Sequence, residues 1–155
     1  MDQSLHRRAA RVICLDRRRR VLLLRWRDPG NGQVLWEPPG GGVEPGESEA
    51  EAARRELHEE TGLTGWVDDS WAVEVERDFC WNGERFAGPE RFYGLEVEEA
   101  VDAHPASLTD SETGALLGSG WFSFDEISRL EDRVEPPDLP GIVSSLLAMR
   151  RVLRD

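Results

Sequence analysis

Three glutamates lie close together in the segment RELHEE at residues 55–60. The surrounding sequence favours a helix, because Ser48 is a good N-cap and several alanines, which are strong helix formers, follow it. With about 100° between successive helical residues, Glu59 lies roughly 60° to one side of Glu56 and Glu60 roughly 40° to the other. The three carboxylates therefore share one face of the expected helix.

This carboxylate face points to a bound cation, because like charges at such spacing repel one another. Carboxylate oxygens are hard ligands that suit Mg2+ or Mn2+, and Mg2+ is usually held by a few carboxylates together with substrate phosphates. The alternative is a solvated acidic helix face, which is common in a chain with 31 Asp and Glu residues. The glutamates alone favour that alternative, whereas the longer pattern around them favours a metal site.

The longer pattern covers residues 41–63, which fit the spacing G-x5-E-x7-R-E-U-x-E-E-x-G-U, with U an aliphatic residue. The fixed positions are all occupied, by Gly41, Glu47, Arg55, Glu56, Leu57, Glu59, Glu60, Gly62 and Leu63. This segment resembles the Nudix box, the signature of a family of Mg2+-dependent diphosphate hydrolases. The resemblance is sharp over residues 36–63, and the rest of the chain follows the general pattern of small, MutT-like bacterial members.

The resemblance implies a metal-ligand set. The glutamates of the box, here Glu56, Glu59 and Glu60, would ligate the metal ions and take part in catalysis. The carbonyl group of the glycine before the box, here Gly40, is a further expected ligand. We therefore expect Mg2+ as the cofactor, with Mn2+ as a substitute.

Two further residues complete the expected site. Arg55 resembles the box arginine that orients the glutamates, and we expect it to pair with Glu47. An ordinary salt bridge between helix and loop is compatible with that role. Nudix enzymes often recruit one more acid from outside the box, and Glu112, in the polar segment ahead of Trp121, is our candidate. Asp102, Asp110 and Glu90 compete with it, and a plain surface position is an equally good explanation of Glu112.

The resemblance implies hydrolysis of a diphosphate linkage in a nucleoside diphosphate joined to another moiety, with water attacking phosphorus. A hydrolase that removes modified nucleoside triphosphates is the alternative within the same class. A non-catalytic nucleotide or ADP-ribose sensor is the alternative of another class, but such a protein should show a degraded box. An isopentenyl diphosphate isomerase would share the fold, yet it needs a catalytic cysteine and a modified box. Cys14 and Cys80 lie outside any matching motif, and the intact box argues against such an enzyme.

Specificity is less visible in the sequence. A nucleobase needs an aromatic platform and a few polar groups. Candidate platforms are Trp26, Trp81, Phe92, Tyr93 and Trp121, and candidate phosphate-binding residues are Arg27, Arg85 and Arg91. Aromatic residues in strands are more often core residues than stacking platforms, and most exposed arginines are simply solvated.

Composition limits the remaining possibilities. At 155 residues the chain fits a single domain, expected over residues 1–155. The formal charge of −12 argues against a nucleic-acid polymer or an anionic membrane as partner, so we expect a small-molecule nucleotide substrate. The N-terminus lacks the apolar core of a secretion signal, which favours a cytoplasmic protein. A homodimer is left open, and Cys14 and Cys80 are expected as buried free thiols.

Apolar runs and turn residues predict an α/β fold. The resemblance implies a Nudix-type α/β/α sandwich, with a mixed β-sheet between helices. The expected strands cover residues 9–15 and 21–26 (a hairpin), 34–37, 71–79 and 90–98 (a pair) and 120–123, with a polar loop over residues 99–120. The expected helices cover residues 48–61, 125–130 and 139–153.

Overall fold

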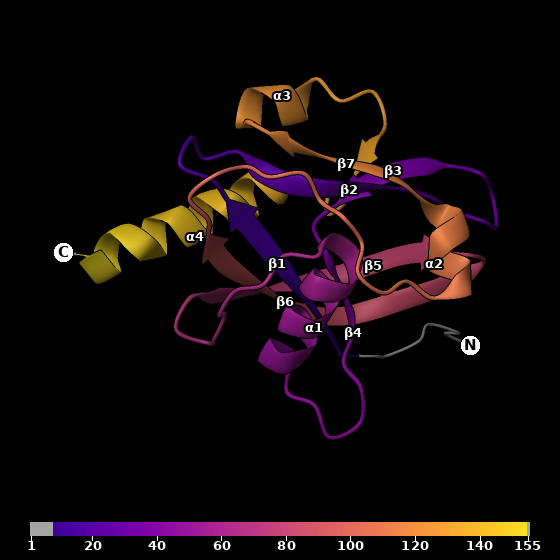
Figure 1. Ribbon diagram of the computed structural model, residues 1–155, viewed down its shortest axis with the longest axis horizontal. Coiled ribbons are helices and arrows are strands. Elements are labelled where there is room, and N and C mark those ends of the chain that lie inside the picture. The colour runs from indigo at the N-terminus through magenta and orange to yellow at the C-terminus, as the bar shows by residue number, and fades with distance from the viewer. Residues whose placement is uncertain (1–7, 155) are drawn as a thin grey trace.

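The computed structural model describes residues 8–154, so residues 1–7 of the N-terminal segment that lacks a secretion signal's apolar core lie outside the described residues. Within the described residues, eight strands form one mixed sheet (Figure 1). The strands are β1 (Ala9–Leu15), β2 (Val21–Arg27), β3 (Val34–Glu37), β4 (Gly40–Gly42), β5 (Ala72–Trp81), β6 (Glu84–Glu96), β7 (Leu116–Phe122) and β8 (Arg133–Val134). The helices are α1 (Glu49–Thr61), α2 (Asp110–Ala115), α3 (Phe124–Ser128) and α4 (Leu139–Arg154).

The sheet divides between its first two strands. β1 and β2 form the expected hairpin, but the paired residues are only Leu15 and Val21, next to the turn. Beyond that point β4 pairs with β1, while β7 and β3 pair with the two edges of β2. On the other side of β1 lie β6, which is parallel to it, and then β5. The two halves of the sheet therefore separate and leave space between them.

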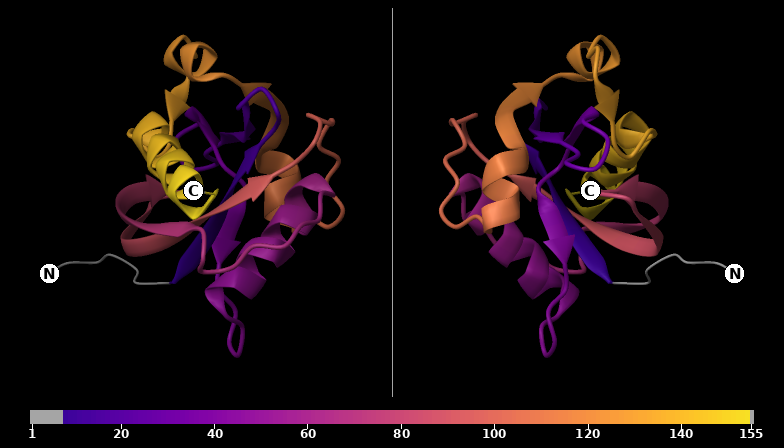
Figure 2. Two further views of the ribbon diagram at one scale, coloured as in Figure 1. Left: turned by 90° about the vertical axis from the view of Figure 1, so that its left-hand side faces the viewer. Right: turned by 90° about the vertical axis from the view of Figure 1, so that its right-hand side faces the viewer.

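Helices cover both faces of β1, as Figure 2 shows for α1 and α4. Along β1 the side chains alternate between faces. Val12 and Cys14 join the cluster that contains Leu57 of α1, whereas Ile13 and Leu15 join the cluster that contains residues of α4. This layered arrangement confirms the predicted α/β sandwich with a mixed sheet.

Helix α1 begins and ends where its sequence predicts. The Ser48 hydroxyl accepts a hydrogen bond from the Glu51 amide, and the Glu51 side chain accepts one from the Ser48 amide, which completes a capping box. At the other end Gly62 adopts a left-handed conformation with φ 76°, and its amide donates to the His58 carbonyl. Both ends are fixed by local interactions, so the position of the glutamates along the helix is fixed as well.

The prediction of a polar loop over residues 99–120 was wrong in its second half. Thr109 and Glu112 form a capping box that starts α2, and β7 then pairs with β2 from Leu116 onwards. The Thr-x-x-Glu signature was visible in the sequence. The strand expected over residues 120–123 is therefore longer, because β7 begins at Leu116. The short strands β4 and β8 were not predicted.

The two cysteines differ. Cys14 is buried near the C-terminal end of β1, as predicted, but Cys80 is exposed, which corrects the prediction for that residue. Cys80 lies near the end of the β5–β6 hairpin, where the side chains of Phe79 and Trp81 face the cavity described below. Because neighbouring strand residues point to opposite faces, Cys80 faces away.

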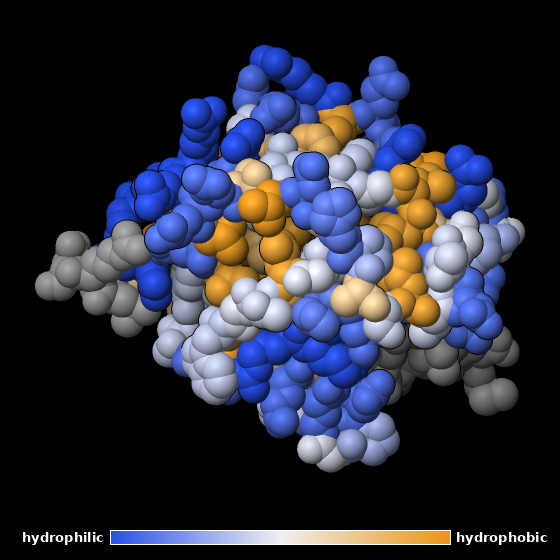
Figure 3. Space-filling model, in the orientation of Figure 1, coloured by the Kyte–Doolittle hydropathy of each residue, from blue (hydrophilic) through white to orange (hydrophobic). Residues whose placement is uncertain are grey.

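The described surface is mixed in character. On the face drawn in Figure 3, apolar side chains lie in patches separated by hydrophilic ones. None of the described helices is long and apolar enough to cross a membrane. The homodimer left open by the sequence stays a prediction.

The close backbone contact between β4 and β1 predicts that a side chain at Gly40 destabilises the fold. A methyl group on Gly40 would lie 2.4 Å from the Ala10 carbonyl oxygen and 2.7 Å from the Arg11 Cα atom. We expect Gly40→Ala to lower the free energy of unfolding by about 2 kcal/mol or more, because neither backbone atom can move easily. Gly118→Ala, where nothing lies within 4 Å, is the control and should change stability by under about 0.5 kcal/mol. Denaturant titrations measure this difference. Equal losses of unfolding free energy in the two variants would contradict the close contact at Gly40.

Candidate active site

Three acids come together from two helices. Glu56 and Glu60 project from α1, and Glu112 comes from α2. Among the described residues, these three form a group in which the nearest carboxylate oxygens all lie within 4.8 Å of one another. The sequence-predicted Glu112 is therefore placed beside two of the box glutamates, whereas its competitors Asp102 and Asp110 are exposed and outside this group.

The glycine run of β4 lies directly against these acids. The Gly40 amide donates a 2.9 Å hydrogen bond to Glu60 Oε1. A Cβ atom on Gly41 would lie 2.7 Å from Glu56 Oε1. The absence of side chains at both positions lets the backbone approach the carboxylates. The structure thus shows an amide contact for Gly40, and the carbonyl of Gly40 as a metal ligand stays a prediction.

Arg55 holds the carboxylates from the side. Its guanidinium makes two bonds to Glu47, at 2.8 and 3.0 Å, which is the expected ion pair. Its Nη1 atom also donates to Glu56 Oε1 at 2.9 Å and to Glu59 Oε2 at 3.2 Å. Its Nη2 atom donates to the Gly42 carbonyl, which ties the loop to the helix. Glu59 therefore contacts Arg55 and lies outside the three-acid group, so its role as a ligand stays a prediction.

Burial changes the proton affinity of the acids. It raises the pKa of Glu56 to about 7, although the hydrogen bond from Arg55 opposes this shift. Burial and the neighbouring Glu56 charge also raise the pKa of Glu60 well above its usual value, against the Gly40 amide and Arg11. A divalent cation would supply the positive charge that otherwise comes from protons. The donor set of three carboxylates suits a hard cation of this kind.

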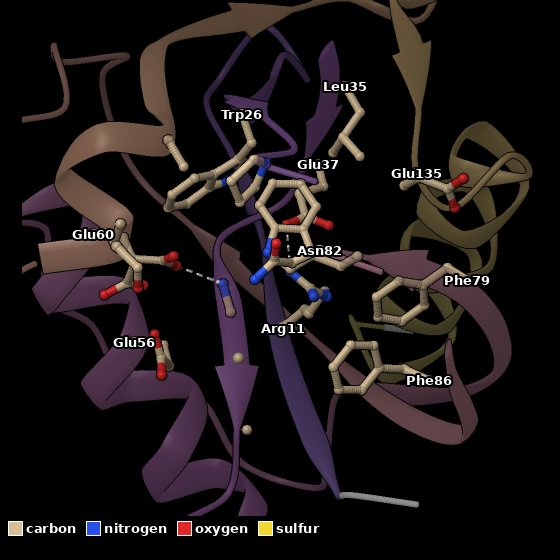
Figure 4. A pocket seen from close by; sticks show the side chains of 18 residues that line it. Arg11, Trp26, Leu35, Glu37, Glu56, Glu60, Phe79, Asn82, Phe86 and Glu135 are labelled. Atoms are coloured by element: carbon tan, nitrogen blue, oxygen red, sulfur yellow. Dashed lines mark hydrogen bonds and ion pairs between the residues drawn. The ribbon is translucent and has the colours of Figure 1, made fainter. Parts of the chain in front are cut away.

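A cavity of about 270 Å3 extends from the three acids across the divided sheet. Figure 4 shows Glu56 and Glu60 on one side of it and Phe79 and Phe86 on the other, with Arg11 between. The rings of Phe79 and Phe86 are stacked with centroids 5.4 Å apart. The cavity thus has an acidic end and an aromatic end, which suits a ligand with both phosphates and a flat ring.

The aromatic candidates divide into two groups. Trp26 and Trp81 line the cavity and contact each other edge to face, with centroids 6.5 Å apart. Phe92 and Tyr93 are buried in the core clusters on the two faces of the sheet. Trp121 donates a hydrogen bond to the Val101 carbonyl and is not among the lining residues.

The arginine candidates lie outside the cavity lining. Arg85 pairs with Asp78 at 2.7 Å, and Arg91 pairs with Asp69 at 3.2 Å. Arg27, at the end of β2, is exposed. None of these three arginines is among the described residues that line the cavity. The structure therefore gives no support to these arginines as phosphate-binding residues in this cavity.

Sequence reasoning missed a buried ion network that begins at the cavity floor. Arg11 contacts Glu90 at 3.0 Å and Glu37 at 3.4 Å, and Arg77 contacts Glu90 at 2.7 Å. Arg77 also reaches Glu135 at 3.5 Å. Although burial lowers it, the charges of Glu37 and Glu90 raise the pKa of Arg11 above its usual value. The signal in the sequence was a single arginine inside the otherwise apolar run AARVICL.

The chain resembles known proteins in sequence. The protein-family model of the NUDIX domain matches residues 5–142. An RNA pyrophosphohydrolase of Erythrobacter litoralis is 29% identical over 145 residues, covering 83% of this chain and 83% of that protein. A putative 8-oxo-dGTP diphosphatase of Bacillus subtilis is 45% identical over 58 residues, covering 37% of this chain and 36% of that protein.

Solved structures show the same fold at low sequence identity. An Ap4A hydrolase binary complex from C. elegans has a TM-score of 0.66 and 21% identity, covering 92% of this chain and 98% of that one. The MutT protein from Methanosarcina mazei has a TM-score of 0.62 and 19% identity, with full coverage of both chains (100% each). These two structures establish the architecture alone.

The raised pKa of Glu56 predicts a pH effect on the metal-free protein. Because its pKa rises from 4.5 to about 7 on folding, the native state binds more protons in this window, and stability falls as the pH rises through it. Glu56→Gln removes this titration, so at pH 8 in a chelator the variant should be more stable than wild type, by an amount on the order of 3 kcal/mol. Below about pH 4.5 the difference should vanish.

Thermal unfolding at several pH values would measure this difference. Glu99→Gln, at an exposed loop position, is the control and should follow the wild type throughout. A difference between Glu56→Gln and wild type that stayed constant from pH 4.5 to 8 would contradict the raised pKa of this partly buried carboxylate.

Proposed function

The chain belongs to the NUDIX hydrolase family, and on this premise we propose that it hydrolyses the diphosphate linkage of a nucleoside diphosphate joined to another group, nucleoside triphosphates included. One observation carries the proposal. A single cavity has the carboxylates of Glu56, Glu60 and Glu112 at one end and the rings of Trp26, Phe79, Trp81 and Phe86 at the other. The first end suits metal-bound phosphates, and the second suits a nucleobase.

Glu56, Glu60 and Glu112 would hold Mg2+, with Mn2+ as a substitute. Glu59 and the Gly40 carbonyl are proposed as further ligands on the family resemblance alone. A divalent ion bound there would neutralise phosphate oxygens and make a coordinated water more acidic. The proposal assigns catalysis to this group because hydrolysis needs both effects near the phosphorus atom.

The neighbouring residues orient the carboxylates. Arg55 fixes Glu56 through a 2.9 Å hydrogen bond, and the Gly40 amide fixes Glu60 at 2.9 Å. Glu112 accepts a hydrogen bond from the Thr109 amide as part of its capping box. One of these carboxylates would accept the proton of the attacking water. Holding all three in place before the substrate arrives lowers the cost of ordering them during the reaction.

RNA with a diphosphate linkage in its 5′-terminal di- or triphosphate is a second candidate substrate. A relative that aligns over 83% of this chain is named an RNA pyrophosphohydrolase. A second cleft in the described structure is lined by Arg17, Arg19, Arg150 and Arg151, together with Asp16 and Glu96. Arginines at this cleft would contact RNA phosphates despite the overall charge of −12, although Arg150 already pairs with Glu96 at 3.1 Å and Arg17 with Glu98 at 3.8 Å. A short 5′-triphosphorylated RNA therefore belongs in the substrate panel.

The test is a panel of nucleoside triphosphates, 8-oxo-dGTP, dinucleoside polyphosphates, nucleoside diphosphate sugars and 5′-triphosphorylated RNA. Each is assayed with Mg2+ and with Mn2+ for release of nucleoside monophosphate, diphosphate or phosphate. We expect hydrolysis of at least one nucleotide in the panel, with full dependence on the divalent ion. Cleavage that continued in a chelator, or no cleavage of any nucleotide, would overturn the proposal.

Removing one charge from the acid group should reduce turnover. Glu60→Gln and Glu112→Gln should each lower kcat about 100-fold, because each removes a charge that holds the metal or assists the water. Glutamine can replace glutamate in the capping box, so Glu112→Gln should keep its melting temperature. Asp110→Asn, on the same helix but outside the acid group, is the control. Near wild-type turnover of both glutamine variants at saturating Mg2+ would refute the site.

Mg2+ should also stabilise the folded protein. The native state holds three close carboxylates that the unfolded chain separates, so millimolar Mg2+ should raise the melting temperature by mass action. NaCl at equal ionic strength should raise it less, because monovalent ions screen without coordinating. Glu60→Gln should reduce the Mg2+ effect. Equal shifts from both salts in wild type would indicate screening alone.

A further inference from the structure

The tip of the β5–β6 hairpin is attached to the loop between β2 and β3. Asp28, which is 4% exposed, starts that loop. Its Oδ1 atom accepts hydrogen bonds from the Asn82 amide at 2.9 Å and from the Gly30 amide at 2.8 Å. A Cβ atom on Gly30 would lie 3.1 Å from the Asn82 Cα atom, so the two backbones are in close contact.

This attachment crosses the division of the sheet. The β5–β6 hairpin belongs to the half that contains β1, whereas the Asp28 loop belongs to the half that contains β2. The edge-to-face contact between Trp26 of β2 and Trp81 of β5 crosses the same division. Asp28 therefore helps to close the aromatic end of the cavity.

The residue that Asp28 holds also faces the cavity. Asn82 is one of the lining residues, next to Trp81 in sequence, and it lines the same cavity as Trp26 and Phe79 (Figure 4). Its side-chain amide offers both a hydrogen-bond donor and an acceptor. The edges of nucleobases present donors and acceptors side by side, which such an amide can match.

The backbone of Asn82 limits the directions available to that amide. Its φ is 50°, a left-handed conformation that asparagine tolerates better than most residues. The Asp28 carboxylate holds the adjoining amide, and Gly30 closes the space behind it. We propose that Asn82 recognises the nucleobase edge of the substrate and that Asp28 is the positioning residue that holds it there. This proposal rests on the proposed nucleotide substrate.

Two substitutions at Asn82 separate recognition from folding. Asn82→Gly removes the side chain and keeps the left-handed turn, because glycine adopts that conformation freely. Asn82→Asp also tolerates the turn, but it replaces an amide by two acceptors. Two acceptors suit the N1–H and N2–H donors of guanine and oppose the N1 acceptor of adenine. Asn82→Asp should therefore raise the ratio of kcat/KM for GTP to that for ATP about tenfold.

Asn82→Gly should reduce the differences in kcat/KM among ATP, GTP, CTP and UTP, mainly through KM, with little change in kcat or melting temperature. Asp28→Ala should reduce the same differences and also lower the melting temperature, because the Gly30 and Asn82 amides lose their buried acceptor. Asp28→Asn should restore much of the selectivity, because the asparagine oxygen can accept the same hydrogen bonds. A merely structural role for Asp28 would lower the melting temperature without changing the ratios of kcat/KM among the four nucleotides.

Binding provides the deciding measurement. Calorimetry with Mg2+ and the α,β-methylene analogues of ATP and GTP, which resist cleavage at that linkage, gives the base preference without catalysis. An altered preference in Asn82→Asp supports the proposal, even if wild type hydrolyses no nucleotide and the proposed function fails. A base preference in Asn82→Asp and Asn82→Gly that equals wild type overturns it, as does the absence of nucleotide binding by wild type.

Discussion

The site depends on one unfavourable arrangement: one oxygen from each of three carboxylates lies within 4.8 Å of the other two. The positive groups beside them do not balance three negative charges. Bringing such charges together and out of water is costly, and the raised pKa values of Glu56 and Glu60 express that cost. The surrounding contacts reduce it. Arg55 and the Gly40 amide each donate to one carboxylate, and the glycines of β4 allow the backbone to approach. The capping box of α1 then fixes where along the chain these contacts occur.

The division of the sheet turns this acid group into one end of a cavity. Since β1 and β2 pair only beside their turn, β4 can occupy the edge of β1 that faces α1. Pairing of β7 with β2 fixes the chain just after α2 and so brings Glu112 to Glu56 and Glu60. The β5–β6 hairpin supplies the rings at the far end. The acid group therefore depends on the β1–β4 and β2–β7 pairings, whereas the Phe79, Trp81 and Phe86 rings depend on the β5–β6 pairing.

The sequence predicted the parts of the site that local interactions determine. The family, the sandwich fold, helix α1 and the Arg55–Glu47 pair follow from residues close together in the chain, and the structure and comparisons agree with them. Other features depend on partners far away in sequence. Arg11 meets Glu90 across 79 residues, and β7 is a strand because β2 lies beside it, although its own sequence has little apolar alternation. Cys80 was expected to be buried because strand character was visible and the direction of its side chain was not.

Under the proposed function, the charge of the cavity would make an acidic protein selective among phosphates. Five glutamates and one arginine are among the described residues that line it: Glu37, Glu56, Glu60, Glu112, Glu135 and Arg11. Glu37 and Glu90 already neutralise the charge of Arg11, so Arg11 attracts a substrate phosphate only weakly. A free diphosphate would meet a net negative surface and be repelled. Under the proposed function, only phosphates that arrive with a divalent cation, or meet one already held by the acids, would enter. The same excess of carboxylates that destabilises the metal-free site would then exclude uncomplexed anions from it.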